Sequence, residues 1–466
     1  MELLIPLDSR SKKPLYEQIY SHICAEIRSG ALKAGDRLPS TRVLAEHLKV
    51  SRSTTQMAYD QLLAEGYMES RPCRGYFVSH LDELVETGPS GAEEMETTAE
   101  PDAGWRVDFS PRGIDLDSFP YHVWRKLSRN TLVDDNKEMF HSGNHQGEPG
   151  LREAIRSYLH SARGVNCSPE QIIVGAGSEY LLMLLSQILE GKHVIAMENP
   201  TYKQAYRVFR SLDYEVCPVE MDANGMEPEL LTRSGANVAY VMPSHQFPTG
   251  VVMPVGRRQE LLKWAVEAPD RYIIEDDYDS EFRYRGKPIP ALQGMDRSGR
   301  VIYLGTFSKC IAPAIRVSYL VLPTHLLLRY RSQTSFYAST VSRIDQNILY
   351  QFLAGGYFER HLNRMRAVYK TKHDLLLEQI EPLRERFEIR GEHAGIHILL
   401  TSRQGESEEQ LIQKAEEAGV KVYGLSSYFI HPQHNHRPAT VVLGYASLSE
   451  EQIAEGIRLL MECWGA

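Results

Sequence analysis

The sequence predicts a multidomain protein in which a small helical unit precedes a much larger α/β unit. Three observations support this prediction. The chain has 466 residues, which is too long for one ordinary domain. Its apolar residues follow a helical period up to about residue 66, and alternating strand and helix patterns begin at Val107. Between these parts, residues 79–104 contain eight Asp or Glu and no Lys or Arg, which predicts a flexible acidic linker.

The composition is that of a globular protein without a membrane or disulfide signature. Hydrophobic residues make up 42% and charged residues 24% of the chain, and no apolar run approaches the roughly 18 residues of a membrane span. The N-terminus lacks the pattern of a signal peptide. The cysteines form no Cys-x-x-Cys pair, so we expect no metal site, no disulfide framework and a reduced cytoplasmic location. A net charge of −9 argues against a chain that coats nucleic acid, but permits one local basic face.

The first unit, residues 12–78, shows three helical patterns followed by a hairpin pattern. The expected helices cover residues 14–29, 42–48 and 52–65, and two short strands are expected within residues 67–78. In the second helix, Val43, Leu44 and Leu48 should face inward. Ser51 is a suitable N-cap for the third helix. This order of elements predicts a winged helix-turn-helix.

The third helix of this unit has the side chains of a DNA-reading element. It begins Ser51-Arg-Ser-Thr-Thr-Gln56, and small hydrogen-bonding and cationic side chains at a helix N-terminus suit phosphates and the base edges of double-stranded DNA. Arg42 and Arg74 would flank it from the preceding helix and from the wing. Composition alone leaves open a general interaction module with solvated charges.

The motifs of this unit resemble the GntR family of bacterial regulators. They are Pro14-Leu-Tyr-Glu-Gln-Ile19, Gly35-Asp-Arg-Leu-Pro-Ser-Thr-Arg42, Leu48-Lys-Val-Ser-Arg-Ser-Thr-Thr55, Leu62-Leu-Ala-Glu-Gly-Tyr67 and Arg74-Gly-Tyr-Phe-Val78. In that family the start of the recognition helix, the arginine after Pro-Ser-x and the wing contact DNA. The resemblance therefore implies DNA contacts by Arg42, Ser51, Arg52, Thr54 and Arg74. The wing tip here, Pro72-Cys-Arg-Gly75, departs from the glycine-rich tip that is usual in the family.

Two stretches of the larger unit predict a cofactor site. Residues 273–282 and 301–309 each begin as a buried apolar strand and end in polar residues, as parallel strands do where they open into a site. The side chains that they deliver, with one that follows shortly after, are Asp276, Tyr278, Thr306, Ser308, Lys309 and Arg316. An acid, a phenol, a lysine and an arginine beside two hydroxyls are the groups that hold pyridoxal 5'-phosphate (PLP).

Each of these side chains has an expected role toward that cofactor. Lys309 would form the Schiff base, and we expect burial and the nearby Arg316 to lower its pKa. Asp276 would keep a proton on the pyridine nitrogen, and the phenol of Tyr278, on the same side of the strand, would bond the 3-oxygen. The groups expected to clamp the phosphate are Thr306, Ser308 and Arg316. A surface loop or a strand-end cap would explain each residue singly, but the whole set in this order favours the cofactor.

Other segments add candidates to this site. Residues 172–179 read as a strand entering a helix, and the backbone N–H groups there suit a phosphate. The residues of this cradle are Gly175, Gly177, Ser178 and Glu179. Tyr202, at the end of a strand and turn, could stack on a flat ring. His245 has apolar neighbours, which favours a packed, hydrogen-bonded histidine over an acid/base.

The larger unit resembles the fold-type I aminotransferases and, within them, the MocR/GabR subfamily of GntR-type regulators with an aminotransferase-like effector domain. The motifs are Pro243-Ser-His-Gln-Phe-Pro-Thr-Gly250, Glu275-Asp-Asp-Tyr-Asp-Ser-Glu-Phe-Arg-Tyr284, Gly305-Thr-Phe-Ser-Lys309 and Pro313-Ala-Ile-Arg316. The resemblance implies PLP on Lys309, with Asp276 at the pyridine nitrogen. It also implies Tyr278 at the 3-oxygen and Tyr202 over the ring. A homodimer is implied as well, usually head-to-tail with exchanged DNA-binding domains.

Two positions depart from that resemblance, and one further residue is a candidate for ligand binding. Catalytic aminotransferases carry Asn-Pro-x-Gly where this chain has Phe247-Pro-Thr-Gly250, so an asparagine that contacts the cofactor is absent. Some members that respond to GABA carry an arginine where this chain has Gln204, which argues against a GABA-like effector. Arg437, just ahead of an expected strand over residues 440–445, is our candidate for binding a substrate carboxylate.

We therefore expect a DNA-binding domain (1–78), a linker (79–104) and a PLP-binding effector domain (105–466). The effector domain should have a mostly parallel sheet and a small α+β subdomain from about residue 380. The expected function is a PLP-dependent transcriptional regulator that senses PLP or an amino compound and binds its operator as a homodimer. Two alternatives stay open: a working aminotransferase with a DNA-binding appendage, and a PLP sensor that controls vitamin B6 synthesis. We expect no net turnover, although a transaminase half-reaction is compatible with these residues.

Overall fold

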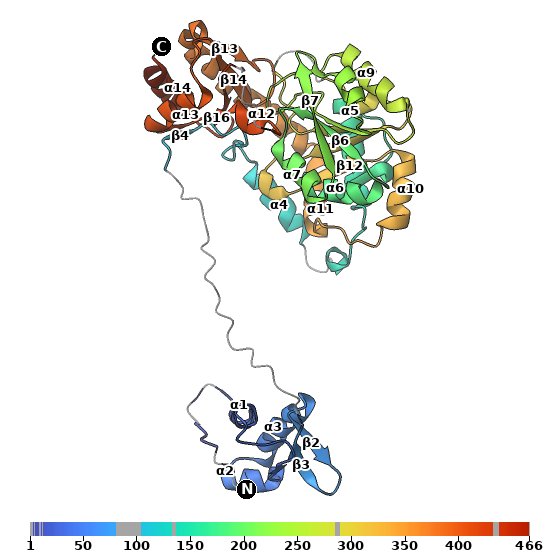
Figure 1. Cartoon of the computed structure of the whole chain (residues 1–466), viewed down its shortest axis with the longest axis vertical. Helices are drawn as coiled ribbons and strands as arrows, with labels where there is room; N and C mark the ends of the chain where they lie inside the picture. The colour runs from blue at the N-terminus through green and yellow to red at the C-terminus, as the bar shows by residue number, and fades with distance from the viewer. Residues whose placement is uncertain are drawn as a thin grey trace. The chain divides into compact units, whose positions relative to one another are not determined.

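The computed structural model describes residues 3, 5–8, 11, 13–80, 104–132, 137–284, 289–431 and 438–465. The chain divides into two compact units, Met1–Glu100 and Pro101–Ala466, and each is described by itself (Figure 1). Most of the expected linker lies outside the described residues, and so does Arg437.

The first unit is a winged helix-turn-helix, as predicted. Its helices are α1 (Leu15–Arg28), α2 (Thr41–Leu48) and α3 (Arg52–Ala64), and its strands β1 (Arg37–Leu38), β2 (Met68–Arg71) and β3 (Gly75–Val78) form an antiparallel sheet in the order β1-β3-β2. Ile19 and Ile23 of α1 pack in one core with Ala58 and Leu62 of α3. The hydroxyl of the buried Thr55 donates to the carbonyl of Thr41, 2.8 Å away, which fixes α3 against α2.

Two details of this unit differ from the prediction. The expectation that Val43 faces inward is wrong, because this side chain is 55% exposed. The buried residues of α2 are Thr41, Leu44 and Ala45, which follow the spacing of one helix face, and Val43 lies off that face. The two-residue strand β1 was not predicted, since so short a strand is defined by its pairing with β3 and carries no periodicity of its own.

The second unit is built on a mixed, mostly parallel sheet. Its strands are β5 (Ile172–Gly175), β6 (Val194–Asn199), β7 (Glu215–Asp222), β8 (Gly225–Met226), β9 (Val238–Val241), β10 (Tyr272–Asp277), β11 (Val301–Thr306) and β12 (Ser318–Val321), in the order β5-β12-β11-β10-β9-β6-β7-β8. The neighbours β11, β10, β9, β6 and β7 run parallel, whereas β12 and β8 are antiparallel to the strands beside them. Because β9, β10 and β11 are parallel neighbours, their carboxyl ends meet at one edge.

Helices cover both faces of this sheet (Figure 1). One face packs against α6 (Ser178–Ile188), α7 (Lys203–Ser211) and α10 (Thr324–Gln333). The other packs against α5 (Pro149–Arg163), α8 (Pro228–Arg233), α9 (Val255–Val266), α11 (Arg343–Ala354) and the first half of α12 (Tyr357–Gln379). The helix α4 (Tyr121–Thr131) lies against α11. Short 3-10 helices occur at Lys137–Phe140, Pro169–Gln171, Gln293–Met295, Pro313–Ile315, Glu381–Glu385 and Leu425–Tyr428.

A smaller α+β subdomain follows at the C-terminal end. Its sheet has the order β13-β14-β17-β16 and is made of β13 (Phe387–Arg390), β14 (His397–Ser402), β16 (Tyr423–Gly424) and β17 (Thr440–Gly444). The end of α12 packs on it together with α13 (Glu408–Glu417) and α14 (Glu450–Trp464). The early strand β4 (Val107–Asp108) pairs with β15 (Val420–Lys421), and the next residue, Phe109, is buried in the core of this subdomain. The small subdomain therefore carries the chain segment that follows Phe109.

No helix in the described parts of the chain is long and apolar enough to cross a lipid bilayer.

Candidate functional site

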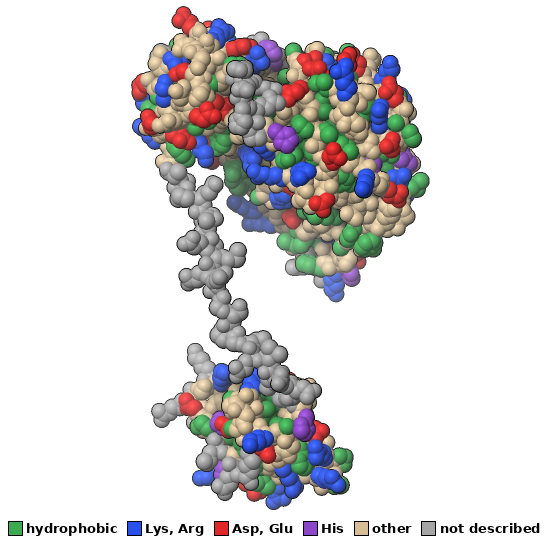
Figure 2. Space-filling model, viewed as in Figure 1, with side chains coloured by type: hydrophobic (Ala, Val, Ile, Leu, Met, Phe, Trp, Pro, Cys, Tyr) green, Lys and Arg blue, Asp and Glu red, His purple; other side chains and the backbone are tan. Residues whose placement is uncertain are grey.

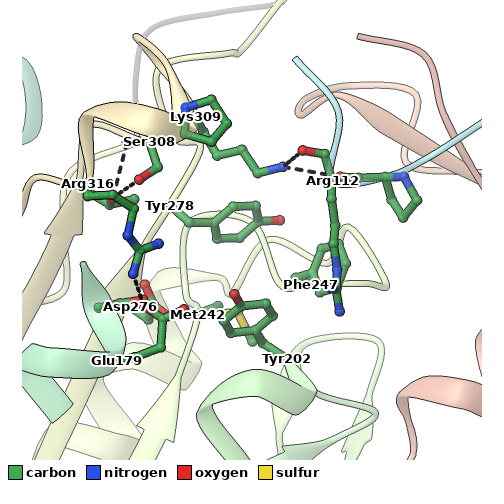
Figure 3. Close-up of a pocket in the computed structure, with 14 residues that line it drawn as sticks. Arg112, Glu179, Tyr202, Met242, Phe247, Asp276, Tyr278, Ser308, Lys309 and Arg316 are labelled. Atoms are coloured by element: carbon green, nitrogen blue, oxygen red, sulfur yellow. Dashed lines mark hydrogen bonds and ion pairs between the residues drawn. The ribbon is translucent and has the colours of Figure 1, made fainter. Parts of the chain in front are cut away.

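A pocket of about 200 Å³ lies at the carboxyl ends of the central strands (Figure 3). It is lined by Pro111, Arg112, Ser178, Glu179, Tyr202, Met242, Phe247, Asp276, Tyr278, Thr306, Ser308, Lys309, Pro313 and Arg316. Met242 follows β9, Asp276 and Tyr278 come from the end of β10, and Lys309 follows β11. The parallel register places the ends of these strands side by side, which is where sheets of this kind bind ligands.

Successive side chains of β10 point to opposite faces of the sheet, so its neighbouring carboxylates lie in different surroundings. Asp276 and Tyr278 line the pocket. Asp277, on the opposite face, accepts hydrogen bonds from Arg163 at 2.8 Å and from the hydroxyl of Tyr303 at 2.6 Å. The period of two along a strand thus leaves one buried carboxylate in the pocket and pairs the next one with a buried arginine.

Asp276 is an almost fully buried carboxyl, with 7% of its surface exposed. Burial raises its pKa to about 7, and a hydrogen bond donated by the hydroxyl of Tyr240 on β9 opposes that rise. A buried carboxylate with one donor on one oxygen can still receive a cationic N–H on the other. This is the donor that a protonated pyridine nitrogen would offer.

Lys309 donates a hydrogen bond to the carbonyl of Arg112 at 2.7 Å and a longer one to the carbonyl of Pro111 at 3.4 Å (Figure 3). Burial lowers the pKa of its amine to about 8; the charge of Asp279 opposes this shift and the charge of Arg112 adds to it. The predicted lowering is therefore present, but the cation that contributes to it is Arg112 and not Arg316.

One end of the pocket is an anion cradle. The helix α6 begins at Ser178, and its cap residue Gly177 has a φ of +98°; a Cβ at this position would collide with the guanidinium of Arg316. Arg316 forms an ion pair with Glu179 at 2.9 Å. On the same side, Thr306 accepts a hydrogen bond from the backbone N–H of Ser308 at 3.1 Å. A helix N-terminus, a guanidinium and two hydroxyls form the donor set that a phosphate group requires.

The walls between the two ends of the pocket are aromatic and apolar. Tyr202 and Phe247 meet edge to face with their ring centres 6.0 Å apart, and Phe247 meets Tyr278 in the same way at 5.9 Å. Met242 completes this part of the wall. Figure 3 shows Tyr202 and Tyr278 directed into the pocket, so a flat ring would lie against them.

His245 does not line the pocket but lies behind Tyr278. Its Nδ1 is 2.8 Å from the carboxylate of Asp279 and 3.0 Å from the hydroxyl of Tyr278. The side chain is 3% exposed, so it is the packed, hydrogen-bonded histidine that the sequence favoured. A cavity of about 10 Å³ lies next to it, lined in part by Ser244 and Arg163, and it has about the size of one water molecule.

The structure brings together in this pocket nine of the residues that the sequence proposed for the cofactor, and Gly177 caps the helix beside them. The nine are Ser178, Glu179, Tyr202, Asp276, Tyr278, Thr306, Ser308, Lys309 and Arg316. The prediction missed Pro111 and Arg112, which nothing in the local sequence associates with residues almost 200 positions later. It also missed Tyr240, whose place on β9 opposite Ile274 of β10 is a matter of strand register.

In the first unit, the candidate DNA-contacting residues lie at the start of α3 and around it. The hydroxyl of Ser51 accepts a hydrogen bond from the backbone N–H of Thr54 at 3.1 Å, and so caps the helix. Arg52 and Arg74 are exposed, and Arg42 is exposed in an ion pair with Glu46 at 3.1 Å. Figure 2 shows Lys and Arg side chains over the part of this unit that Figure 1 labels β2 and β3.

Two family comparisons match the two units. Residues 15–78 match the family described as bacterial regulatory proteins, gntR family. Residues 115–460 match the family described as aminotransferase class I and II.

Individual relatives match over nearly the whole chain. The uncharacterized HTH-type transcriptional regulator YdeL of Bacillus subtilis is 41% identical, covering 97% of this chain and 97% of its own length. The probable rhizopine catabolism regulatory protein MocR of Rhizobium meliloti is 35% identical over 98% and 95% of the two chains. The HTH-type pyridoxine biosynthesis transcriptional regulator PdxR of Corynebacterium glutamicum is 32% identical over 92% of each.

Solved structures match the larger unit. The crystal structure of a multiple substrate aminotransferase from Thermococcus profundus superimposes with a TM-score of 0.69 and 28% identity, covering 78% of this chain and 91% of that one.

Proposed function

Since the chain belongs to the MocR/GabR subfamily of GntR-type regulators, in which a winged helix-turn-helix is joined to a class I and II aminotransferase domain, we propose that it holds PLP on Lys309 and senses PLP or an amino compound there. The protein is a DNA-binding transcriptional regulator. PLP binding is a feature of the aminotransferase fold. One observation carries the assignment to this chain: a lysine of lowered pKa, a buried carboxyl and an anion cradle share one pocket.

The chemistry of the pocket fits PLP at three points. The phosphate would take the N-terminus of α6, Arg316 and the hydroxyls of Thr306 and Ser308. The ring nitrogen would donate to Asp276, whose other oxygen already accepts from Tyr240. The ring would lie between aromatic and apolar side chains. When bound, PLP supplies an electrophilic carbon and an electron-accepting ring, and the protein supplies binding and orientation.

The residues around Lys309 prepare its amine to react. Only a neutral amine attacks a carbonyl, and burial lowers the pKa of Lys309 to about 8, so a useful fraction is neutral near physiological pH. The carbonyls of Pro111 and Arg112 accept from this amine and hold it at the pocket. Tyr278 adds a phenol that can bond a ring oxygen.

The hydrogen bonds from Lys309 to Pro111 and Arg112 could link ligand binding to a change in the arrangement of the small subdomain. Pro111 and Arg112 follow Phe109, which is part of the core of the small subdomain. A ligand that takes up the amine of Lys309 removes both hydrogen bonds, and so changes how the small subdomain is held to the central sheet. A ligand changes DNA affinity only if it binds one arrangement better than another, and these bonds are an interaction that differs between them.

The proposed partner assembly is a homodimer on repeated DNA half-sites. Aminotransferase-like domains typically form dimers, and GntR-type helix-turn-helix units bind DNA. We propose that the two subunits of this dimer are arranged head-to-tail. The proposed DNA contacts are Arg42, Ser51, Arg52, Thr54 and Arg74.

A second candidate function is control of vitamin B6 synthesis in response to PLP itself. It is favoured by the likeness to a relative named as a pyridoxine biosynthesis regulator. In that case PLP alone would change operator affinity, without any amino compound.

A working aminotransferase is the remaining alternative, because lysine, carboxyl and phenol are all present in the pocket. Steady-state turnover of amino and keto acids at about 1 per second or faster would establish it.

The test of the proposed function is a comparison of the purified wild-type protein with Lys309→Ala. We expect the wild type to show the visible absorption band of PLP linked to a lysine, and the variant to lack that band while keeping its fold by circular dichroism. Identical spectra, or a wild type that stays colourless with added PLP, would refute the assignment of Lys309.

A further inference from the structure

We propose that His245 is a positioning residue for Tyr278: by holding the carboxylate of Asp279, it leaves the Tyr278 hydroxyl free to donate a hydrogen bond into the pocket. This inference rests on the proposed function, because the acceptor in the pocket would be the ring oxygen of PLP. It assigns a role to His245 and Asp279, two buried side chains that do not line the pocket themselves.

The hydrogen-bond contacts of the His245 ring meet at one atom. Nδ1 lies 2.8 Å and 3.1 Å from the two carboxylate oxygens of Asp279, and 3.0 Å from the hydroxyl oxygen of Tyr278. An ionised carboxylate only accepts hydrogen bonds, so Nδ1 carries a proton and donates it to Asp279. A ring nitrogen that carries a proton cannot accept as well. The proton of the Tyr278 hydroxyl therefore needs another acceptor.

Two acceptors compete for that proton. One is the carboxylate of Asp279, which follows Tyr278 in the chain and interacts with its hydroxyl. The other is a ligand oxygen in the pocket, into which Figure 3 shows Tyr278 directed. Without His245, the buried Asp279 would lose its N–H donor at 2.8 Å, and a buried acceptor without a donor is costly. The Tyr278 hydroxyl would then turn to Asp279 and away from the pocket.

The Tyr278 hydroxyl keeps its proton and so remains a donor. Burial raises its pKa well above the ordinary value of a tyrosine, and the negative charges of Asp279 and Asp276 add to this rise. The phenol is therefore neutral at neutral and mildly alkaline pH. The other titratable or charged side chains next to the His245 ring are His397 of β14, with ring centres 5.3 Å apart, and, across the cavity of about 10 Å³, Arg163 and Arg283.

The small subdomain holds the His245 ring in place. A Cβ at Gly395, just before β14, would collide with this ring, so the imidazole fits directly against the glycine. The carbonyl of Gly395 accepts hydrogen bonds from the hydroxyls of Tyr284 at 2.7 Å and Tyr445 at 2.8 Å, and its N–H donates to the carbonyl of Phe282 at 2.8 Å. Because Gly395 is fixed in this way, an alanine there would displace the ring and leave every polar group of the site present.

The experiment follows the pH at which the visible band of PLP linked to Lys309 changes in the full-length protein. The linking nitrogen loses a proton in this step. A hydrogen bond donated to the neighbouring ring oxygen stabilises the negative charge left on that oxygen, and so lowers the midpoint of the change. Loss of one hydrogen bond to a charged oxygen should raise the midpoint by about one pH unit.

We expect Tyr278→Phe and His245→Phe each to raise the midpoint by about one pH unit, and the double variant to raise it no further. A purely structural role of His245 would instead add its effect to that of Tyr278→Phe. His245→Asn should return most of the way to the wild-type midpoint, because its amide –NH2 group can donate from about the position of Nδ1.

Gly395→Ala tests the inference even if His245→Phe does not fold. It should raise the midpoint in the wild-type background and have no effect in the Tyr278→Phe background. Gly405→Ala is the matched control. Gly405 also lies in the small subdomain and has a φ of +74°, close to the +79° of Gly395, but a Cβ there meets nothing within 4 Å. Its midpoint should be that of the wild type.

Three results would overturn the inference and leave the proposed function standing, because the visible band is intact in each. The first is a wild-type midpoint in folded His245→Phe or Gly395→Ala. The second is a shift that adds fully to that of Tyr278→Phe. The third is an unchanged midpoint in Tyr278→Phe itself. Absence of the visible band in the wild type refutes the proposed function, and this inference with it.

Discussion

Oδ2 of Asp279 lies 2.8 Å from Nδ1 of His245, and both side chains are almost completely buried. Nε2 of His245 has no hydrogen-bond partner among the described residues. The hydrogen-bond geometry therefore places a proton on Nδ1 of His245, donated to Asp279. The negative charge of Asp279 also acts on the amine of Lys309, whose pKa it raises against the effect of burial.

The rate at which PLP loads onto the protein freed of cofactor should rise with pH around a midpoint of about 8. Burial lowers the pKa of Lys309 to about 8, and the neutral amine is the reactive form. At pH 7.5 about a quarter of the amine would be neutral, compared with roughly 0.1% for an ordinary lysine of pKa about 10.4. Stopped-flow growth of the visible band between pH 6 and 10 measures this, and a midpoint near 10 would contradict the buried, reactive amine.

Asp279→Asn should move that midpoint to lower pH. The negative charge of Asp279 stabilises the protonated amine of Lys309, and so opposes the effect of burial. When the charge is removed, the cationic form is less stable and the pKa falls further. The same pH series on the variant checks the shift. Asp270→Asn, an exposed carboxyl beyond the opposite end of β10, is the matched control; an equal shift in both variants would rule out a local effect.

Tyr240→Phe should weaken PLP binding by about tenfold, since it removes the donor to the buried carboxylate of Asp276. Burial already raises the pKa of Asp276 to about 7, and the hydrogen bond from Tyr240 keeps it from rising further. Without that bond, Asp276 is protonated more easily and is a poorer partner for a ring N–H. The loss should be larger at pH 6 than at pH 8. Equilibrium dialysis with PLP measures it, and Tyr272→Phe on β10, which loses only a bond to His325, should bind like the wild type.

The parts of the site that local pattern determines could be predicted from the sequence, and the parts that depend on tertiary packing could not. Asp276 and Tyr278 share a face of β10 because side chains alternate along a strand, and this period is visible in one stretch of sequence. Arg112 reaches Lys309 only because β4 is paired with β15 in the small subdomain, a contact between segments more than 300 residues apart in sequence. Tyr240 meets Asp276 through the register of β9 against β10. The exposed Val43 shows the same limit within one short helix, where eight residues do not define a face by themselves.

Arg52→Ala should weaken operator binding by about tenfold and reduce the dependence of affinity on salt. Arg52 is the first residue of α3, is exposed, and follows the cap residue Ser51, so its cation lies at the helix end where phosphates are best received. Loss of one phosphate contact lowers the slope of log affinity against log salt by about one, whatever the DNA sequence. Fluorescence anisotropy at several salt concentrations measures both quantities. Lys33→Ala removes another exposed cation, from the segment before β1, and should leave the slope unchanged.

If Arg52→Ala instead lost affinity for the operator but not for unrelated DNA, Arg52 would contact a base edge and not a phosphate, because only base contacts discriminate between sequences.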